Sequence, residues 1–235
     1  MSKAGIMRFD ATRARELLTD GMAEMTLAIN QGQIDALLEY LLLMAKWNPV
    51  YNLTAIRQTE EMVSAHLLDS LAIIGLLDVW LTNKPKAKIL DVGTGGGLPG
   101  VVLAIMRPQW SLTLIDPVHK KTAFLQQVKA QLQLDNLTVI NGKVEDLPTE
   151  AQFDLITSRA FSSLVNFVQL SEHVLQADGC FAAMKGVFPS EEMDALQQTF
   201  NHQWQIEPHE IHVPQLNAQR HLIKISRSNP SHHPK

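Results

Sequence analysis

Apolar residues in the first eighty positions recur at intervals of three and four, which is the spacing of an amphipathic helix. Two such faces occur early in the chain, within residues 17–25 and within residues 34–44. We expect the second helix to end before Asn48-Pro49, because proline has no backbone N–H to continue the helix. A third helix is predicted from about residue 59 through 74, with two glutamates in its first turn.

From residue 88 onward the pattern changes to short apolar runs separated by helical stretches. The runs predict seven strands, at residues 89–92, 112–115, 137–140, 154–157, 180–184, 206–213 and 221–226. Strands that alternate with helices favour a parallel sheet, whereas the last two runs are joined by a polar loop and predict a hairpin. The expected fold is α/β: a Rossmann-like seven-stranded sheet, parallel with an antiparallel C-terminal hairpin, preceded by an N-terminal helical extension.

A glycine-rich turn follows the first predicted strand, in the stretch KILDVGTGGGLPG at residues 88–100. Gly93, Gly95 and Gly97 lack a Cβ, so a ligand can approach the main chain closely there. The spacing differs from the dinucleotide fingerprint, because the sixth position counted from Gly93 is Leu98. A phosphate-binding P-loop is also excluded, because the turn contains no lysine.

Two acids identify the ligand that this turn is expected to bind. Asp91 precedes the glycines, which is the pattern of methyltransferases that bind S-adenosylmethionine. Asp116 ends the next predicted strand, where a carboxylate can accept hydrogen bonds from both ribose hydroxyls. The sequence therefore predicts S-adenosylmethionine as cofactor, with Gly93, Gly95 and Asp116 in its site.

Composition limits the other possibilities. A chain of 235 residues with 46% hydrophobic content can bury one α/β core and a modest extension, and we expect a monomer. The predicted division is a helical extension at 1–80, a methyltransferase domain at 81–228 and a disordered tail at 229–235. The net charge of -4 argues against a protein that coats nucleic acid nonspecifically. The single cysteine excludes an intramolecular disulfide and fits the cytoplasm; neither a metal site nor a membrane span is expected.

Several short motifs, taken in order, closely resemble the glucose-inhibited division protein B family. They are Trp47-Asn48, Tyr51-Asn52-Leu53-Thr54, His66 with Asp69-Ser70, the glycine turn through Gly100, Ser158-Arg159-Ala160-Phe161, Lys185-Gly186 and Arg220-His221-Leu222. The resemblance covers roughly residues 33–225. It implies a bacterial methyltransferase that modifies guanine N7 in 16S ribosomal RNA, at guanine 527 in the 530 loop. The implied partner is the 16S RNA or the small ribosomal subunit.

The resemblance also assigns cofactor contacts. They fall on Gly93 and Leu98 in the turn, on Val144 and Glu145 after the third strand, and on Arg159 after the fourth. The Arg159 guanidinium can bind the methionine carboxylate or an RNA phosphate, and a surface ion pair is the simpler alternative.

The residues at the fourth and fifth strands limit which atoms can accept the methyl group. Enzymes that methylate exocyclic amines commonly carry an acid or Asn followed by Pro-Pro at the end of the fourth strand, and this chain has Ser158-Arg159. Methylation at pyrimidine C5 needs a cysteine nucleophile, but Cys180 is predicted inside a buried strand. Guanine N7 already carries a lone pair, so the enzyme needs mainly to position N7 against the methyl group. Lys185 and Arg220 are the candidate catalytic cations, directed at guanine O6 or at a phosphate.

RNA binding is expected on a local surface, with Asn52, Arg57, His66, Lys120 and Lys121 as candidates. Other cations that can share this face are Arg8, Arg13, Arg15, Lys46 and Arg227. His66 and Asp69, three residues apart on one helix, can contact RNA or the loop around Asn52. Two other functions remain open. They are a small-molecule methyltransferase with a lid over an apolar pocket, and a nonenzymatic ribosome-associated regulator on the same fold.

Overall fold

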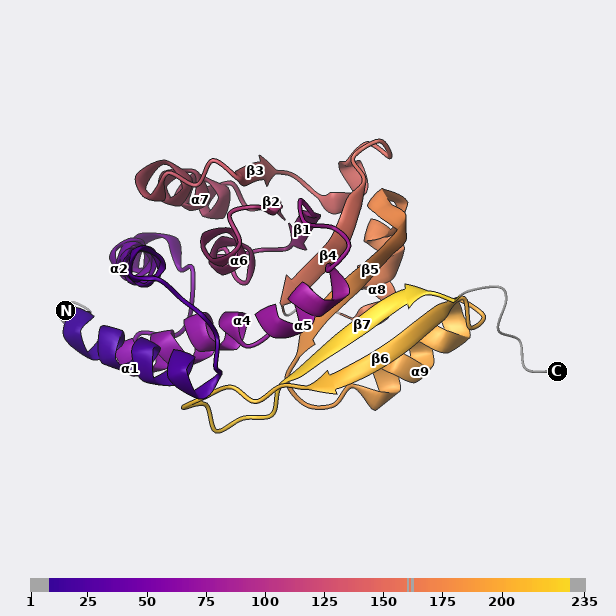
Figure 1. Ribbon diagram of the computed structural model, residues 1–235. Coiled ribbons are helices and arrows are strands. Elements are labelled where there is room, and N and C mark those ends of the chain that lie inside the picture. The colour runs from indigo at the N-terminus through magenta and orange to yellow at the C-terminus, as the bar shows by residue number, and fades with distance from the viewer. Residues whose placement is uncertain (1–8, 160, 162, 229–235) are drawn as a thin grey trace, which may run out of the picture.

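A seven-stranded sheet in the order β3-β2-β1-β4-β5-β7-β6 forms the centre of the computed structural model, which describes residues 9–159, 161 and 163–228 (Figure 1). The strands are β1 (Lys88–Val92), β2 (Ser111–Asp116), β3 (Leu137–Asn141), β4 (Phe153–Arg159), β5 (Leu175–Lys185), β6 (Trp204–Glu210) and β7 (His221–Arg227). The first five strands pair in parallel, and β7 pairs antiparallel to both β5 and β6. The predicted α/β sheet with its antiparallel C-terminal hairpin is confirmed. The predicted tail at 229–235, Arg8 and Ala160 lie outside the described residues.

Helices cover both faces of the sheet. The helices of four residues or more are α1 (Ala11–Glu24), α2 (Gln31–Tyr51), α3 (Thr59–Met62), the π-helical η1 (Val63–Leu68), α5 (Ile74–Trp80), α6 (Gly100–Met106), α7 (His119–Leu132), α8 (Leu164–Ser171) and α9 (Ser190–Thr199). Three-residue turns complete them, namely α4 (Asp69–Leu71), η2 (Val144–Asp146) and η3 (Glu172–Val174). In Figure 1, α2, α6 and α7 lie together at one end, α8 lies beside β5, and α9 lies against the yellow hairpin.

Alternate residues of the central strands enter two different cores. In β1, Ile89 joins a cluster with residues of α1, α2, α6 and α7, whereas Leu90 joins a cluster with residues of α8 and α9. Phe181 and Ala182 divide in the same way in β5. This alternation follows from the strand period of two. The N-terminal helices therefore share one continuous core with the sheet.

The second helix does not end where proline predicts. α2 continues through Pro49 to Tyr51, and Asn52 closes it in a left-handed conformation. Pro49 lies in the last turn, so the missing donor affects one hydrogen bond only, and the Asn52 N–H still reaches the Asn48 carbonyl at 2.9 Å. Stacking of Trp47 on Tyr51, with ring centroids 5.0 Å apart, packs the same turn. The sixth strand, predicted at residues 206–213, also ends earlier than expected, because β6 ends at Glu210.

The third helical region is longer than predicted and is irregular. It extends over Thr59–Trp80, 22 residues with a mean hydropathy of 1.6, which by length and composition could cross a membrane. However, 67% of its most apolar window is buried inside the protein, as in a core helix. The π-helical segment η1 interrupts its middle, and such segments are frequent at functional sites.

Candidate active site

The glycine turn lies at the carboxyl edge of the sheet, the edge at which β1 to β5 end. Gly93, Gly95 and Gly97 have φ values of 64°, 61° and 100°, which L side chains rarely adopt. A Cβ added at Gly93 or Gly95 would meet nothing closer than 3.9 Å or 4.0 Å, so the space above them is open to a ligand. At Gly97 the same atom would lie 2.6 Å from Leu125 and Val101. The turn therefore presents bare backbone on one side and packs tightly on the other.

Asp116 ties this turn to the next two strands. One carboxylate oxygen accepts from the Gly95 N–H at 3.0 Å, and the other accepts from the Val118 N–H at 2.9 Å. The Asp116 carbonyl accepts from Asn141 Nδ2 at 3.1 Å and from the Gly142 N–H at 3.2 Å. These bonds bring the turn, Asp116 and the loop after β3 to one place, as the cofactor site predicted from the sequence requires.

The predicted residues of the loop after β3 differ in exposure. Val144 is buried in the core with α8, and Glu145 is exposed. Leu98 is buried behind the turn. Neither Val144 nor Leu98 can therefore offer its whole side chain to a ligand, and their backbone groups are the parts that remain for a contact.

Asp91 lies buried beneath the glycine turn. Its Oδ2 accepts from Thr94 Oγ1 at 2.6 Å and from the Gly100 N–H at 2.9 Å, which fixes both ends of the turn. Its Oδ1 is buried and finds no partner within the described residues. Burial raises the pKa of Asp91 to about 6, against the lowering effect of these two hydrogen bonds. The unused oxygen is an acceptor that a bound ligand with an N–H or O–H group would satisfy.

A second hollow, here called the cationic cleft, opens between the end of the sheet and the π-helical segment. Its volume is about 410 Å³, and its lining residues are Ile56, Ala65, His66, Asp69, Arg159, Met184, Lys185, Gly186 and Arg220. Three cations and one carboxylate give this lining a positive charge, although the whole chain carries -4. The cleft therefore favours an anionic ligand, as an RNA phosphate would be.

Asp69 holds two of these cations. Its Oδ1 accepts from Arg220 Nε at 2.7 Å and its Oδ2 accepts from Arg159 Nη1 at 3.3 Å. Arg159 Nη1 also donates to the Ala65 carbonyl at 2.8 Å, so the irregular helix supplies a second anchor. Asp69 is 3% exposed, and a buried carboxylate between two guanidinium groups orients both. Sequence reasoning placed Asp69 on a helix beside His66 but had no signal for its arginine partners.

Lys185 enters the cleft from the end of β5 but is already paired. Its Nζ donates to both carboxylate oxygens of Glu192, at 2.9 Å and 2.8 Å. Glu192 also accepts from the Leu164 N–H at 2.8 Å, which links α8 to α9. Lys185 must therefore exchange this partner, or share it, to reach a substrate oxygen. The Glu192 partner was not foreseen from the sequence.

His66 lies under the loop before α3. Its Nε2 is 2.9 Å from Thr54 Oγ1, so it contacts the loop around Asn52, which is one of the two expected alternatives. Asn48 fixes the same loop by accepting from the Thr54 N–H and donating to its carbonyl, both at 2.9 Å. His66 is 4% exposed, and burial with the Arg159 charge lowers its pKa to about 4. It is therefore neutral at physiological pH.

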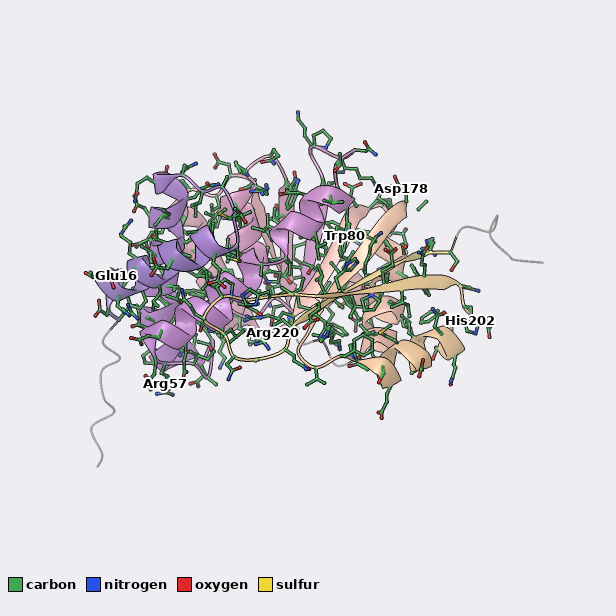
Figure 2. All side chains as sticks on the ribbon, turned by 60° about the horizontal axis from the view of Figure 1, so that its bottom comes forward. Glu16, Arg57, Trp80, Asp178, His202 and Arg220 are labelled. Carbon is green, nitrogen blue, oxygen red and sulfur yellow. The ribbon has the colours of Figure 1, made fainter. Side chains whose placement is uncertain are left out.

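The remaining candidates for RNA contact are spread around the carboxyl edge. Asn52, Arg57 and Lys120 are exposed, and Lys121 approaches Asp116 Oδ2 at 3.5 Å. Arg227 does not belong to this group, because β7 runs antiparallel to β5 and ends at the opposite edge, where Arg227 covers the Trp204 ring. In Figure 2, Arg57 and Arg220 lie toward the lower side of the molecule, whereas Trp80 and Asp178 lie toward the upper side.

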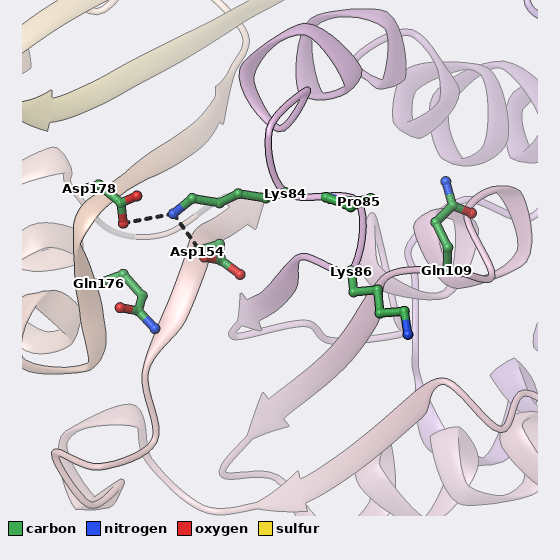
Figure 3. A pocket seen from close by; sticks show the side chains of 7 residues that line it. All are labelled: Lys84, Pro85, Lys86, Gln109, Asp154, Gln176 and Asp178. Atoms are coloured by element: carbon green, nitrogen blue, oxygen red, sulfur yellow. Dashed lines mark hydrogen bonds and ion pairs between the residues drawn. The ribbon is translucent and has the colours of Figure 1, made fainter.

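A further hollow of about 670 Å³ occupies the opposite edge of the sheet (Figure 3). Lys84 crosses it and bonds to Asp154 at 2.9 Å and to Asp178 at 2.7 Å. Asp154 also accepts from the Lys88 N–H at 2.8 Å. The charged groups in this hollow pair with one another near the start of the strands. We therefore assign them a structural role and not a catalytic one.

Cys180 lies inside β5, in the core, and burial raises the pKa of its thiol to about 11. A thiol of this kind carries almost no thiolate at neutral pH. The expected exclusion of a cysteine nucleophile agrees with this position.

Known proteins match nearly the whole chain. A family model described as rRNA small subunit methyltransferase G matches residues 33–223. The protein named ribosomal RNA small subunit methyltransferase G from Janthinobacterium sp. (strain Marseille) is 46% identical over 226 residues, which cover 94% of this chain and 98% of that protein. The protein of the same name from Laribacter hongkongensis is 47% identical over 211 residues, covering 90% and 97%.

Solved structures show the same fold at low identity. The human methyltransferase 10 domain containing protein has a TM-score of 0.56 and 14% identity, and the match covers 80% of this chain and 95% of that chain. An S-adenosylmethionine-dependent methyltransferase structure from Methanococcus maripaludis, described as putative in its own name, has a TM-score of 0.56 and 15% identity, covering 73% and 91%. This chain therefore shares the fold of these two structures.

Proposed function

Because this chain belongs to the rRNA small subunit methyltransferase G family, we propose that it transfers the methyl group of S-adenosylmethionine to N7 of a guanine in 16S ribosomal RNA. The proposed position is guanine 527 in the 530 loop. We propose further that the enzyme acts as a monomer in the cytoplasm, and that the helices and loop before residue 80 form part of the RNA platform.

The observation that carries the proposal is the position of the cationic cleft beside the glycine turn. Ser158 joins the two by donating to the Val92 carbonyl at 2.8 Å, which couples the end of β4 to the end of β1. Arg159 follows directly and reaches into the cleft. A cofactor on the turn and an RNA phosphate in the cleft would therefore approach each other at the end of β4.

The residues present fit the cofactor. Gly93 and Gly95 leave open space above the turn, Asp91 Oδ1 offers an unused acceptor, and Asp116 lies where ribose hydroxyls can replace its backbone donors. Arg159 would take the methionine carboxylate or the adjoining phosphate. When bound, S-adenosylmethionine supplies a methyl group on a positively charged sulfur that a lone pair can attack.

The protein contributes mainly alignment to this reaction. Guanine N7 has a lone pair in the ring plane, so no proton leaves before attack. Near-attack alignment can supply about 7 to 11 kcal/mol, whereas a general base typically contributes about 3 to 5 kcal/mol. Lys185 and Arg220 are proposed to hold guanine O6 or a phosphate. A bidentate arginine on O6 and N7 would block the attacking atom.

The other candidate functions receive less support. A small-molecule enzyme would have a closed apolar pocket under the N-terminal helices, but these helices pack on the sheet and the cleft lining carries charges. A nonenzymatic regulator would have no reason to keep the positive-φ glycines and Asp116 in place around open space.

The test is transfer of labelled methyl to small ribosomal subunits from cells that lack this protein, with the product nucleoside identified. We expect N7-methylguanosine in the 530 loop, and its loss in Gly93→Val and Arg159→Ala. Arg227→Gln is the matched control, because Arg227 lies at the opposite edge of the sheet. Cofactor binding without methyl transfer to RNA would contradict the proposal and favour a small-molecule substrate. No cofactor binding would favour the regulator.

A further inference from the structure

The segment after β5 exposes two adjacent apolar side chains, one and two residues beyond Gly186, which lines the cationic cleft. Val187 is 76% exposed and Phe188 is 46% exposed. Phe188 is the one Phe, Tyr or Trp that counts as exposed in the part of the chain that the structure describes. Scattered single apolar residues are ordinary on a surface. Two adjacent ones near the cationic cleft are a candidate contact for a partner.

The backbone of this segment is held in place on both sides. His221 Nδ1 lies 2.8 Å from the Gly186 carbonyl, and Pro189 is buried at the start of α9, where its carbonyl accepts from the Met193 N–H at 3.0 Å. The exposure of Phe188 therefore follows from a defined backbone path.

Part of Phe188 is open to solvent, because the residue is 46% exposed. Its neighbour is the His221 ring, at a centroid distance of 5.5 Å and an interplanar angle of 75°. In such an edge-to-face pair, His221 covers at most one face of the Phe188 ring. The solvent-exposed part of the ring is the surface on which a flat, unpaired base can stack.

A cation accompanies the ring. Arg220 Nη1 lies 3.9 Å from the position of a Cβ at Gly186, two residues before Phe188. A stacking ring next to a cation for the phosphate is the usual composition of a surface that binds single-stranded nucleic acid. Since the 16S RNA is the proposed substrate, its unpaired bases supply the matching flat surface.

The position of β5 in the sheet indicates which RNA base can stack on Phe188. β5 lies two strands from β1, which at a spacing of about 4.8 Å places the end of β5 roughly 10 Å from the strand that carries the glycine turn. The acceptor guanine must lie close to the methyl group, so Phe188 is too far away to stack on it. A base that flanks the acceptor can reach Phe188 across Arg159 and Lys185.

We propose that Phe188, supported by His221, is a stacking platform for an unpaired base of the substrate RNA that flanks the methylated guanine. This inference rests on the proposed function. It adds a binding residue that acts on the RNA alone and leaves both the cofactor and the chemical step unchanged.

The test compares Phe188→Ala, Phe188→Leu and Phe188→Trp with the wild type in methyl transfer to unmethylated small ribosomal subunits. Both the alanine and the leucine variant should raise KM for the subunit roughly 5- to 150-fold, the range of one lost base stack. Their kcat should stay within about twofold of wild type, and Phe188→Trp should keep the wild-type KM. Cofactor dissociation constants, measured by equilibrium dialysis without RNA, should be equal in all four proteins.

Val79→Ala is the matched control. Val79 is an apolar residue exposed on α5, and its neighbour Asp78 pairs with Arg107 after the end of α6, away from the cleft. This variant should behave as wild type. A wild-type KM in Phe188→Ala would overturn the inference. A wild-type KM in Phe188→Leu would also overturn it, because leucine keeps an apolar contact but cannot stack.

Filter binding of labelled subunits separates this inference from the proposed function. A wild type that binds subunits but transfers no methyl group would contradict the proposed reaction, and the inference would then be judged by the affinity of Phe188→Ala alone. Equal subunit affinity of Phe188→Ala and wild type would overturn the inference even if the reaction is confirmed.

Discussion

The Tyr40 hydroxyl donates to the Gly96 carbonyl oxygen at 2.6 Å, so a buried side chain of α2 holds the glycine turn from below. The Leu53 carbonyl and the Met44 side chain also approach Gly96 from α2 and the loop that follows it. The N-terminal helices are therefore in direct contact with the proposed cofactor site. If the loop after α2 moves on RNA binding, the glycine turn should therefore move with it.

Replacement of Tyr40 by Phe should weaken both folding and cofactor binding. The Gly96 carbonyl would remain buried without its donor, which costs about 1 to 3 kcal/mol in the free energy of unfolding. Urea denaturation measures this loss, and equilibrium dialysis should show a raised dissociation constant for S-adenosylmethionine. The same change at the chain's other tyrosine, Tyr51, is the control and should leave cofactor affinity unchanged. A Tyr40→Phe variant with wild-type stability would show that the hydrogen bond adds nothing.

Replacement of Gly97 by Ala should disrupt the glycine turn. Gly97 has a φ of 100°, and its new Cβ would lie 2.6 Å from Leu125 and from Val101. We expect a loss of about 1 to 3 kcal/mol in the free energy of unfolding from the unfavourable φ and overpacking together. Thermal unfolding measures this change. Gly75→Ala is the matched control, because its Cβ would meet nothing within 4 Å in helix α5, and it should be neutral or stabilising by up to about 1 kcal/mol.

Replacement of Asp69 by Asn should lower methyl transfer to RNA. Both arginines would lose a charged partner, and their orientation in the cleft would no longer be held. We expect kcat/KM for small subunits to fall roughly tenfold or more, as for a lost hydrogen bond to a charged group. Asp78→Asn is the matched control, because it breaks the Asp78–Arg107 pair far from the cleft. Equal loss in both variants would show that only stability is affected.

The pH dependence of the free energy of unfolding should show that His66 is neutral in the folded protein. Burial lowers its pKa from 6.5 to about 4, so between these values the unfolded chain binds a proton that the folded chain does not. The free energy of unfolding that His66 controls should therefore fall as the pH falls from 6.5 toward 4, by about 3 kcal/mol. His66→Gln should lose less stability than wild type between pH 7.5 and pH 4.5, measured by urea denaturation. A constant difference between the two proteins would contradict this.

Asp91 changes the free energy of unfolding with pH in the opposite direction, so its effect must be separated from that of His66. Its pKa is raised from 3.8 to about 6, and the folded chain therefore holds a proton longer than the unfolded chain does. The stability that Asp91 controls should fall as the pH rises from about 4 to about 6. The two effects oppose each other in the wild type. Comparing His66→Gln with wild type isolates His66, because Asp91 is present in both proteins.

The local pattern of the chain was sufficient for the fold class and the cofactor turn. Strand periodicity, the three glycines and an acid at the end of each of two strands are properties of neighbouring residues, so they can be read without coordinates. The predicted ends of elements were less accurate. Pro49 was expected to stop α2, but a proline in the last turn removes only one bond and packing of Trp47 and Tyr51 continues the helix.

Tertiary structure alone decided how the cationic cleft is built. Asp69 and Arg220 are 151 positions apart, and no short-range pattern indicates that one carboxylate holds Arg220 and Arg159 together. The tertiary structure also placed Arg227 at the far edge of the sheet and Phe188 on the surface beside His221. The sequence by itself determined which elements form and which ligand the turn suits, because these depend on neighbouring residues. Which charged residues pair depends on contacts between residues far apart in the sequence. Only folding of the whole chain brings such residues together.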